Sequence, residues 1–315
     1  MVVGRFAPSP TGPLHFGSLI AAVASYCDAK SQQGLWLVRM EDLDQPRTQV
    51  GAATLILQQL KSFGLAWDGE VVYQSQRSDL YAKALQDLAA LPSDYVTNSN
   101  TPQSLIYPCT CTRKEIADSS SHLGVHGQGI EGVIYPNICR MQPIKPNANP
   151  AFRIKTDGVN LQFDDAIQGN VKQDLQKDIG DFVLKRADGL FAYQLAVVVD
   201  DAAQGITYVV RGADLLHSTP RQIYLQQLLG LQTPQYAHVP LAKNMQGEKL
   251  SKQTLATPLN VEATSLQLVS ALQFLGHNPP ENLKKLICSA ILQWAVSHWQ
   301  IAAVPKQVAY QPQYT

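Results

Sequence analysis

The sequence lacks the features that mark membrane-spanning or secreted chains. No run of about 18 apolar residues occurs among its 315 residues. The N-terminus has no positively charged segment followed by an apolar one, so a secretory signal is not indicated. These absences predict a cytoplasmic protein that does not contact a membrane.

An excess of charge of either sign is also absent. Lysine plus arginine and aspartate plus glutamate both number 25, so the formal net charge is zero. Any contact with nucleic acid would therefore have to use a local basic patch rather than the charge of the whole molecule. Composition by itself neither demands nor excludes an RNA partner.

Cysteine is too scarce and too irregularly spaced for a disulfide framework. Five cysteines stand at positions 27, 109, 111, 139 and 288, and an odd number in a chain without a secretory signal favours reduced thiols. Cys27 and Cys288 lie in apolar helical patterns and are expected in the core. The other three offer soft ligands for one structural zinc ion.

A zinc ion held by Cys109, Cys111 and Cys139 needs a fourth ligand. His122 and His126 are the ordinary choices, because neutral imidazole binds zinc well. Tyr135, four residues before Cys139, is the unusual choice, because its phenol would have to be ionised by the metal. The residues alone leave these alternatives open.

Strand and helix patterns alternate over roughly the first 90 residues. We expect strands at 2–6 and 35–40, and helices at about 17–33, 48–63 and 77–91. This rhythm predicts an α/β fold with a doubly wound parallel sheet. The pattern stops near residue 92, where a segment rich in serine, asparagine and proline begins.

This change in amino-acid composition predicts that the chain is organised in four parts. We assign residues 1–95 to the first half of a catalytic domain, 96–150 to a metal-binding insertion, 151–240 to the second half, and 241–315 to a basic loop followed by helices. Strands at 152–155, 182–186, 192–199 and 206–211 are expected to return to the parallel sheet. Thr219, followed by Pro220, is expected to cap a helix.

The segment from Arg5 to Ser18 joins the first strand to the first helix. The X-Pro steps at Pro8 and Pro10 keep its first part extended, and the helix that follows presents free backbone N–H groups where a phosphate can bind. His15 can donate to a phosphate oxygen, and Gly17 lets the backbone approach a nucleotide closely. The alternative is a proline-rich connector with no ligand.

Charged groups follow the ends of three predicted strands. Glu41 ends the second strand, near the Arg5 loop, and a carboxylate beside an arginine suits a substrate that carries both an ammonium and a carboxylate. Tyr193 and Arg211 supply a hydroxyl and a second carboxylate anchor. Two alternatives stay open: the acidic residues after position 40 only lead into a helix, or Arg211 pairs with Asp200, Asp201 or Asp214.

Lys249 and Lys252 lie in a basic loop after Gln246-Gly247-Glu248. Their ammonium groups could stabilise the negative charge that develops on a departing pyrophosphate. A short basic loop alone is more often a solvated turn.

Taken together, these segments resemble the class I aminoacyl-tRNA synthetases of the glutamate type. Arg5 to Ser18 is similar to the first signature of that family and Lys249 to Gln253 to the second. The matches between them, in the family's order, are Arg39 to Arg47, Tyr193, Val197 to Asp201, Arg211 to Asp214 and Thr219 to Gln222. The resemblance covers residues 2 to about 255.

The resemblance implies a Rossmann-type class I synthetase catalytic domain with a zinc-binding insertion and a short C-terminal helical stem-contact region. It implies that glutamate is bound by Arg5, Phe6, Ala7, Pro8, Ser9, Glu41, Tyr193 and Arg211. It assigns ATP to His15, Gly17, Ser18 and Lys252, and catalysis to His15, Lys249 and Lys252. Ser18 stands where the family has histidine, which shifts more of the phosphate contact to His15 and Lys252.

The C-terminal end suggests which branch of the family the chain resembles. Only 62 residues follow Gln253 (315 − 253), which we expect to be too few for an anticodon-binding region. The chain is similar to the branch that activates L-glutamate with Mg-ATP and transfers it to the queuosine base at the wobble position of tRNA(Asp). That resemblance also implies Tyr135 as the fourth zinc ligand. We expect a monomer; the alternatives are a minimal synthetase that acylates a tRNA 3′ end and a non-enzymatic paralogue that binds tRNA or nucleotide.

Overall fold

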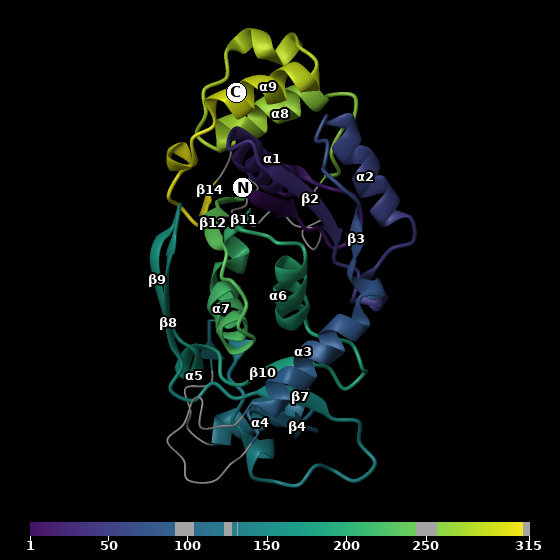
Figure 1. The fold of residues 1–315 in the computed structure, drawn as a ribbon, viewed down its shortest axis with the longest axis vertical. Coiled ribbons are helices and arrows are strands. Elements are labelled where there is room, and N and C mark those ends of the chain that lie inside the picture. Colours follow the sequence, from purple (N-terminus) through teal and green to yellow (C-terminus); the bar gives the residue numbers. More distant parts are fainter. Residues whose placement is uncertain (92–103, 123–127, 131, 244–256, 311–315) are drawn as a thin grey trace.

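The computed structural model describes residues 1–91, 104–122, 128–130, 132–243 and 257–310. The molecule is elongated (Figure 1), with two helices, α8 (Thr264–Phe274) and α9 (Cys288–His298), at one end. A parallel sheet lies beneath them, and an antiparallel sheet stands at the opposite end.

The parallel sheet is built from two sets of strands that meet in the middle. β1 (Val3–Phe6), β2 (Leu35–Met40) and β3 (Val72–Tyr73) pair in parallel, as do β11 (Tyr208–Gly212) and β12 (Gln235–Val239). The Thr207 N–H donates to the Val3 carbonyl at 3.0 Å, which places β1 beside β11. The α/β class with a parallel sheet is therefore confirmed.

Helix α1 (Phe16–Ser31) forms the centre of the main core. Its apolar side chains, including Leu19, Ile20 and Val23, are buried against β1, β11, α8 and α9. A helix that is apolar on most sides is expected in the middle of a domain. This packing holds the Arg5 loop, which runs directly into α1, at the end of the sheet.

The other early helices lie near their predicted ranges. α2 spans Ala52–Ser62 and α3 spans Ser78–Ala90. α2 begins later than expected because Gln45–Arg47 forms a separate 3-10 turn and Gly51 adopts a left-handed conformation with φ 79° just before the helix.

The strand predicted at 192–199 is wrong, because this segment is helix α6 (Tyr193–Ala203). Leu195, Val197 and Val198 are buried, and so are Asp200 and Asp201. A short apolar run is typical both of a buried strand and of a helix that is buried on most sides, so periodicity does not distinguish them. Tertiary packing therefore decided the conformation against the β-branched composition.

Two further strands do not return to the parallel sheet. β7 (Ala151–Ile154) and β10 (Phe182–Lys185) instead pair antiparallel in the order β10-β7-β4, with β4 (Ile106–Cys109). The prediction that these strands join the parallel sheet was therefore wrong. A strand pattern predicts an extended segment but does not indicate which strand it pairs with. β4 comes from the predicted insertion.

A long antiparallel hairpin was not predicted. β8 (Asn160–Asp165) and β9 (Gly169–Asp174) pair along their whole length, and Asp165 lies opposite Tyr236 of β12. These strands carry many polar residues, which hides them from a search for apolar runs. The hairpin nevertheless brings Asp165 to the edge of the parallel sheet.

The remaining elements are short. They are α4 (Arg113–His122), β5 (Gln128–Gly129), β6 (Gly132–Val133), α5 (Leu175–Asp178), α7 (Thr219–Leu228), β13 (Leu241–Ala242) and β14 (Ala309–Tyr310). Among the helices of the described segments, none combines the length and the apolar character that a bilayer crossing requires.

Candidate active site

A cavity of about 520 Å³ opens beside the ends of β1, β2 and β11. Its walls contain eleven residues singled out from the sequence: Arg5, Phe6, Ala7, Pro8, Ser9, His15, Gly17, Ser18, Glu41, Tyr193 and Arg211. Lys249 and Lys252 lie outside the described residues. Ligands of open α/β sheets bind at this position, outside the carboxyl ends of the strands.

Backbone hydrogen bonds hold the loop after β1 against the next strand. The Glu41 N–H donates to the Pro8 carbonyl, and the Gln49 N–H donates to the Pro10 carbonyl, both at 3.0 Å. Pro8 and Pro10 disfavour a helical conformation of the residues before them, so the loop stays extended, and these two hydrogen bonds hold it close to Glu41.

His15 caps helix α1. Its Nδ1 accepts from the Ser18 N–H at 3.3 Å, which places the proton of a neutral ring on Nε2. The described residues on both sides of 244–256 also lie here: Leu241 and Ala242 line the cavity, and Pro258 forms a β-bridge with His15.

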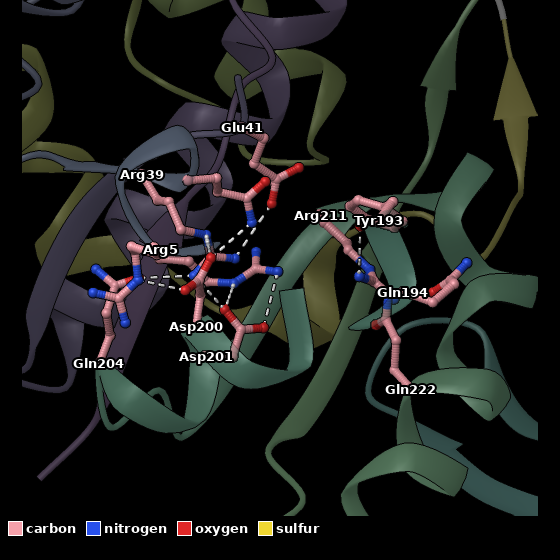
Figure 2. A network of polar contacts seen from close by, with 12 residues as sticks. Arg5, Arg39, Glu41, Tyr193, Gln194, Asp200, Asp201, Gln204, Arg211 and Gln222 are labelled. Atoms are coloured by element: carbon pink, nitrogen blue, oxygen red, sulfur yellow. Dashed lines mark hydrogen bonds and ion pairs between the residues drawn. The ribbon is translucent and has the colours of Figure 1, made fainter. Parts of the chain in front are cut away.

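Two arginines and three carboxylates form a buried network beside the cavity (Figure 2). Asp201 accepts from Arg5 Nε at 3.2 Å and from Arg39 Nη1 at 2.7 Å. Arg39 also contacts Glu41 at 3.3 Å and Asp200 at 3.9 Å. Asp200, fully buried, receives a further ion pair from Arg77 at 2.6 Å. With Arg77 included, the described part of this network carries three positive and three negative charges.

The network shifts the pKa values of its members in different directions. Burial alone would raise the pKa of Asp201, but Arg5 and Arg39 lower it below its usual value. Burial outweighs Arg39 and Arg5 at Glu41, so the pKa of this carboxyl lies above its ordinary value of 4.5. Glu41 lines the cavity and would be stabilised in its ionised form by a ligand cation.

Arg211 is held differently. Its Nε donates to His238 Nε2 at 3.0 Å, its Nη2 to Thr219 Oγ1 at 2.8 Å and to the Leu215 carbonyl at 3.3 Å, and its Nη1 to the Tyr193 hydroxyl at 3.3 Å. The guanidinium also lies 5.7 Å from the centre of the Tyr236 ring.

These partners of Arg211 are uncharged. Burial lowers the pKa of His238 to about 4, so the ring is neutral near pH 7. Asp200 and Asp201, two of the suggested ion-pair partners, bind Arg39, Arg5 and Arg77 instead, and Asp214, the third, is not among the described guanidinium contacts of Arg211. Within the described contacts of its guanidinium, Arg211 therefore keeps a positive charge that no carboxylate neutralises.

Four contributors to the site were not predicted in the roles that they have in the structure. Arg39 and Asp201 form the buried network, while His238 and Asp165 support Arg211. A lone histidine within the apolar run of β12 was the available signal for His238. Thr219 is not the N-cap of α7, because Ser218 occupies that position. The Thr219 hydroxyl instead accepts a hydrogen bond from Arg211.

The three insertion cysteines gather in one cluster. The sulfur atoms of Cys109, Cys111 and Cys139 lie within 4.8 Å of one another. The Tyr135 hydroxyl is 3.4 Å from Cys109 Sγ and 3.6 Å from Cys111 Sγ, and it accepts from the Cys139 N–H at 2.9 Å. His126 and the side chain of His122 are outside what the structure describes. Among the described side chains, one phenol and three thiols therefore converge.

Hydrogen bonding and burial perturb this cluster. Burial raises the pKa of Cys111 to about 12, whereas the pKa of Cys139 falls to about 7 because hydrogen bonds from Tyr135 and the Thr110 backbone outweigh burial. Burial and the neighbouring sulfurs raise the pKa of Tyr135 above its usual value. Three sulfurs and an oxygen suit a tetrahedral zinc ion, whose charge would oppose these upward shifts.

Comparison with known proteins identifies the family. Residues 1–288 match the family model described as tRNA synthetases class I (E and Q), catalytic domain. A glutamyl-Q tRNA(Asp) synthetase of Dechloromonas aromatica is 54% identical over 96% of each chain. Another, of Neisseria meningitidis, is 49% identical over 99% of this chain and 100% of its own length.

Structural comparison agrees on the fold. A glutamate tRNA ligase from Elizabethkingia meningosepticum, crystallised with its amino acid, aligns with a TM-score of 0.77 and 22% identity, covering 99% of this chain and 67% of the ligase. The chain belongs to the class I tRNA synthetases for glutamate and glutamine, within the group of the glutamyl-Q tRNA(Asp) synthetases.

Proposed function

We propose that the protein activates L-glutamate with Mg-ATP and transfers the glutamyl group to the queuosine base at the wobble position of tRNA(Asp). One observation carries the glutamate assignment. Glu41 and Arg211 line the same cavity, and the described guanidinium contacts of Arg211 are uncharged. A zwitterionic amino acid with a second carboxylate complements both groups.

In this proposal the two sides of the cavity bind different ends of glutamate. Glu41 receives the ammonium group, and Arg211 with the Tyr193 hydroxyl binds a carboxylate. Arg5 contributes positive potential but is already paired with Asp201. Phe6, Ala7, Pro8 and Ser9 form the wall between them.

ATP would lie along the N-terminal end of α1. Gly17 and Ser18 offer the first turn of the helix, and the His15 tautomer described above donates from Nε2. Lys249 and Lys252 belong to the segment whose described flanks reach this cavity, which supports a role on the departing pyrophosphate.

The reaction then has two balanced steps. A carboxylate oxygen of glutamate attacks the α-phosphorus of ATP, and pyrophosphate leaves. A queuosine hydroxyl attacks the acyl carbon of glutamyl-adenylate, loses its proton, and releases AMP. Alignment and charge stabilisation supply the catalysis, so no covalent enzyme intermediate is required.

The queuosine assignment rests on the relatives. Their name specifies glutamyl-Q and tRNA(Asp), and they align with this chain over nearly their whole length. The test is to incubate the protein with ATP, labelled glutamate and tRNA from cells with or without queuosine, and then to locate the label after nuclease digestion. Label on the 3′-terminal adenosine, or label independent of queuosine, would contradict the assignment and indicate a minimal glutamyl-tRNA synthetase; no label on either RNA would favour a non-enzymatic binder.

We also propose that Cys109, Cys111, Tyr135 and Cys139 hold one structural zinc ion in an insertion spanning about residues 96–150. Metal analysis should give one zinc per chain. The Cys139→Ser variant should lose the metal. The Cys288→Ser variant should retain it, because the Cys288 thiol donates a hydrogen bond to Thr264 and is not one of the proposed ligands. Equal zinc content in both variants would contradict the ligand set.

We also propose that the protein is a monomer in the cytoplasm, as the sequence predicts. Light scattering tests the oligomeric state, and cell fractionation tests the location.

A further inference from the structure

We propose that Asp165 and His238 are positioning residues for Arg211, because Asp165 holds the His238 ring in the tautomer whose Nε2 accepts from the guanidinium. The inference deepens the proposed function and rests on its assignment of Arg211 to a glutamate carboxylate. Neither Asp165 nor His238 lines the cavity, so both would act through Arg211.

The contacts of Asp165 orient its carboxylate. Its Oδ1 accepts three backbone N–H groups, from Ile167 at 3.0 Å, Gln168 at 2.8 Å and His238 at 3.1 Å. Its Oδ2 lies 2.6 Å from His238 Nδ1. A carboxylate with one oxygen saturated by donors is an acceptor through the other, so the ring proton lies on Nδ1.

This protonation leaves Nε2 of His238 with a lone pair. Arg211 Nε points at that atom from 3.0 Å, and the Thr219 hydroxyl lies 3.2 Å from it. Since an arginine has only donors, the contact is favourable for the Nδ1–H tautomer and repulsive for the Nε2–H tautomer. The His238 ring and the Asp165 carboxylate are both fully buried, so water cannot substitute for either partner.

The described contacts of the guanidinium use the Nε N–H, both N–H groups of Nη2 and one N–H of Nη1, which leaves the second N–H of Nη1 for a ligand. Nε and Nη2 are occupied by His238, Thr219 and the Leu215 carbonyl. Nη1 lies on the side of the Tyr193 hydroxyl, a group that lines the cavity. Fixing one edge sets the direction in which the other meets a carboxylate, which lowers the cost of ordering on binding.

Asp165→Asn tests the tautomer while preserving shape. Because three backbone N–H groups hold one oxygen, the new amide nitrogen faces His238 Nδ1 and donates to it. The ring proton then moves to Nε2 and opposes Arg211, the kind of tautomer error that disables other buried Asp–His pairs. We expect kcat/KM for glutamate in pyrophosphate exchange to fall about 10- to 100-fold, with KM for ATP changed less than about two-fold.

A second background separates this mechanism from a general loss of structure. His238→Gln keeps a carbonyl acceptor for Arg211 and has no tautomer to invert, so Asp165→Asn should cost little more in that background. Equal, additive losses in both backgrounds, or parallel rises in KM for glutamate and ATP, would overturn the proposal.

The histidine ring can be observed directly. With ¹⁵N-labelled histidine, the His238 Nε2 signal should be that of an unprotonated nitrogen in the starting protein and of a protonated one in Asp165→Asn. An unchanged tautomer would overturn the inference. If Arg211→Gln itself leaves KM for glutamate unchanged, the proposed function fails; if Arg211→Gln raises it but Asp165→Asn does not, only this inference fails.

Discussion

Arg39 and Arg211 occupy similar places and have opposite surroundings. Each is buried near the carboxyl end of a parallel strand beside the same cavity. Arg39 touches Asp201, Glu41 and Asp200, and these carboxylates raise its pKa above the usual value although burial alone would lower it. The described guanidinium partners of Arg211 are a hydroxyl, a phenol, a neutral imidazole and a backbone carbonyl.

The difference separates a structural charge from a functional one. A buried cation is expensive unless it is paired, and the network around Arg39 supplies that pairing within the protein. Arg211 has hydrogen bonds but lacks a described carboxylate partner, so a ligand carboxylate would complete its environment. Replacing Arg39 should therefore mainly reduce the free energy of unfolding, whereas replacing Arg211 by the same residue should mainly reduce the kcat/KM for glutamate.

The largest expected effect is on stability at Arg39. Arg39→Met removes a side chain that is 0% exposed and leaves Asp201 and Glu41 with an unmatched buried charge. We expect the free energy of unfolding to fall by about 3–5 kcal/mol. Urea denaturation measures this. Arg47→Met, at an arginine whose side chain is 71% exposed, is the matched control and should leave unfolding nearly unchanged.

Arg211→Met should show the reverse pattern. Its neutral partners lose hydrogen bonds but are left with no unpaired carboxylate, so unfolding should weaken by only about 1–2 kcal/mol. The kcat/KM for glutamate should fall about 100- to 1000-fold, because a charge-assisted contact with the substrate is lost. Pyrophosphate exchange and urea denaturation on the same preparations decide this. A larger stability loss than at Arg39 would break the comparison.

Glutamate affinity should depend on pH through Glu41. Burial raises the pKa of this carboxyl, so protonation begins at higher pH than for an exposed glutamate. An ammonium needs the ionised form, and KM for glutamate should rise as pH falls through the raised pKa, by up to about tenfold per pH unit. Glu41→Gln should have a high KM that lacks this dependence. An inflection at or below 4.5, the ordinary value, would contradict the assignment.

The smallest effect is expected at Tyr193. Tyr193→Phe removes one hydroxyl that receives a 3.3 Å hydrogen bond from Arg211 and keeps the ring. We expect KM for glutamate to rise about 3- to 10-fold with unfolding nearly unchanged. Steady-state kinetics give the first quantity and thermal denaturation the second. A loss as large as that of Arg211→Met would mean that Tyr193 is the main carboxylate anchor.

Local patterns predicted the first half of the fold well and the second half less well. The two strands and three helices expected before residue 91 lie close to their predicted positions, whereas the two-residue strand β3 was not predicted. Helix α6 was mistaken for a strand because its apolar run is short and buried on most sides. The hairpin β8–β9 was missed because its polar residues face solvent along much of its length.

The site shows the same division. Glu41 and Arg211 stood out as charged residues at the ends of apolar strands, and both line the cavity. Asp165 and His238 are 73 positions apart, and no local pattern links them. Their contact depends on the parallel pairing of β8 with β12, which is a tertiary event.

The sequence by itself determined the family, the parallel α/β core and eleven of the residues that line the cavity, because signature spacing and apolar periodicity are local properties of the chain. Only the tertiary structure decided which arginine is neutralised and which is not. Buried charges are balanced by neighbours that come from distant segments. Asp200 and Asp201 form ion pairs with Arg5, Arg39 and Arg77. Asp165 contacts Arg211 only through the uncharged ring of His238.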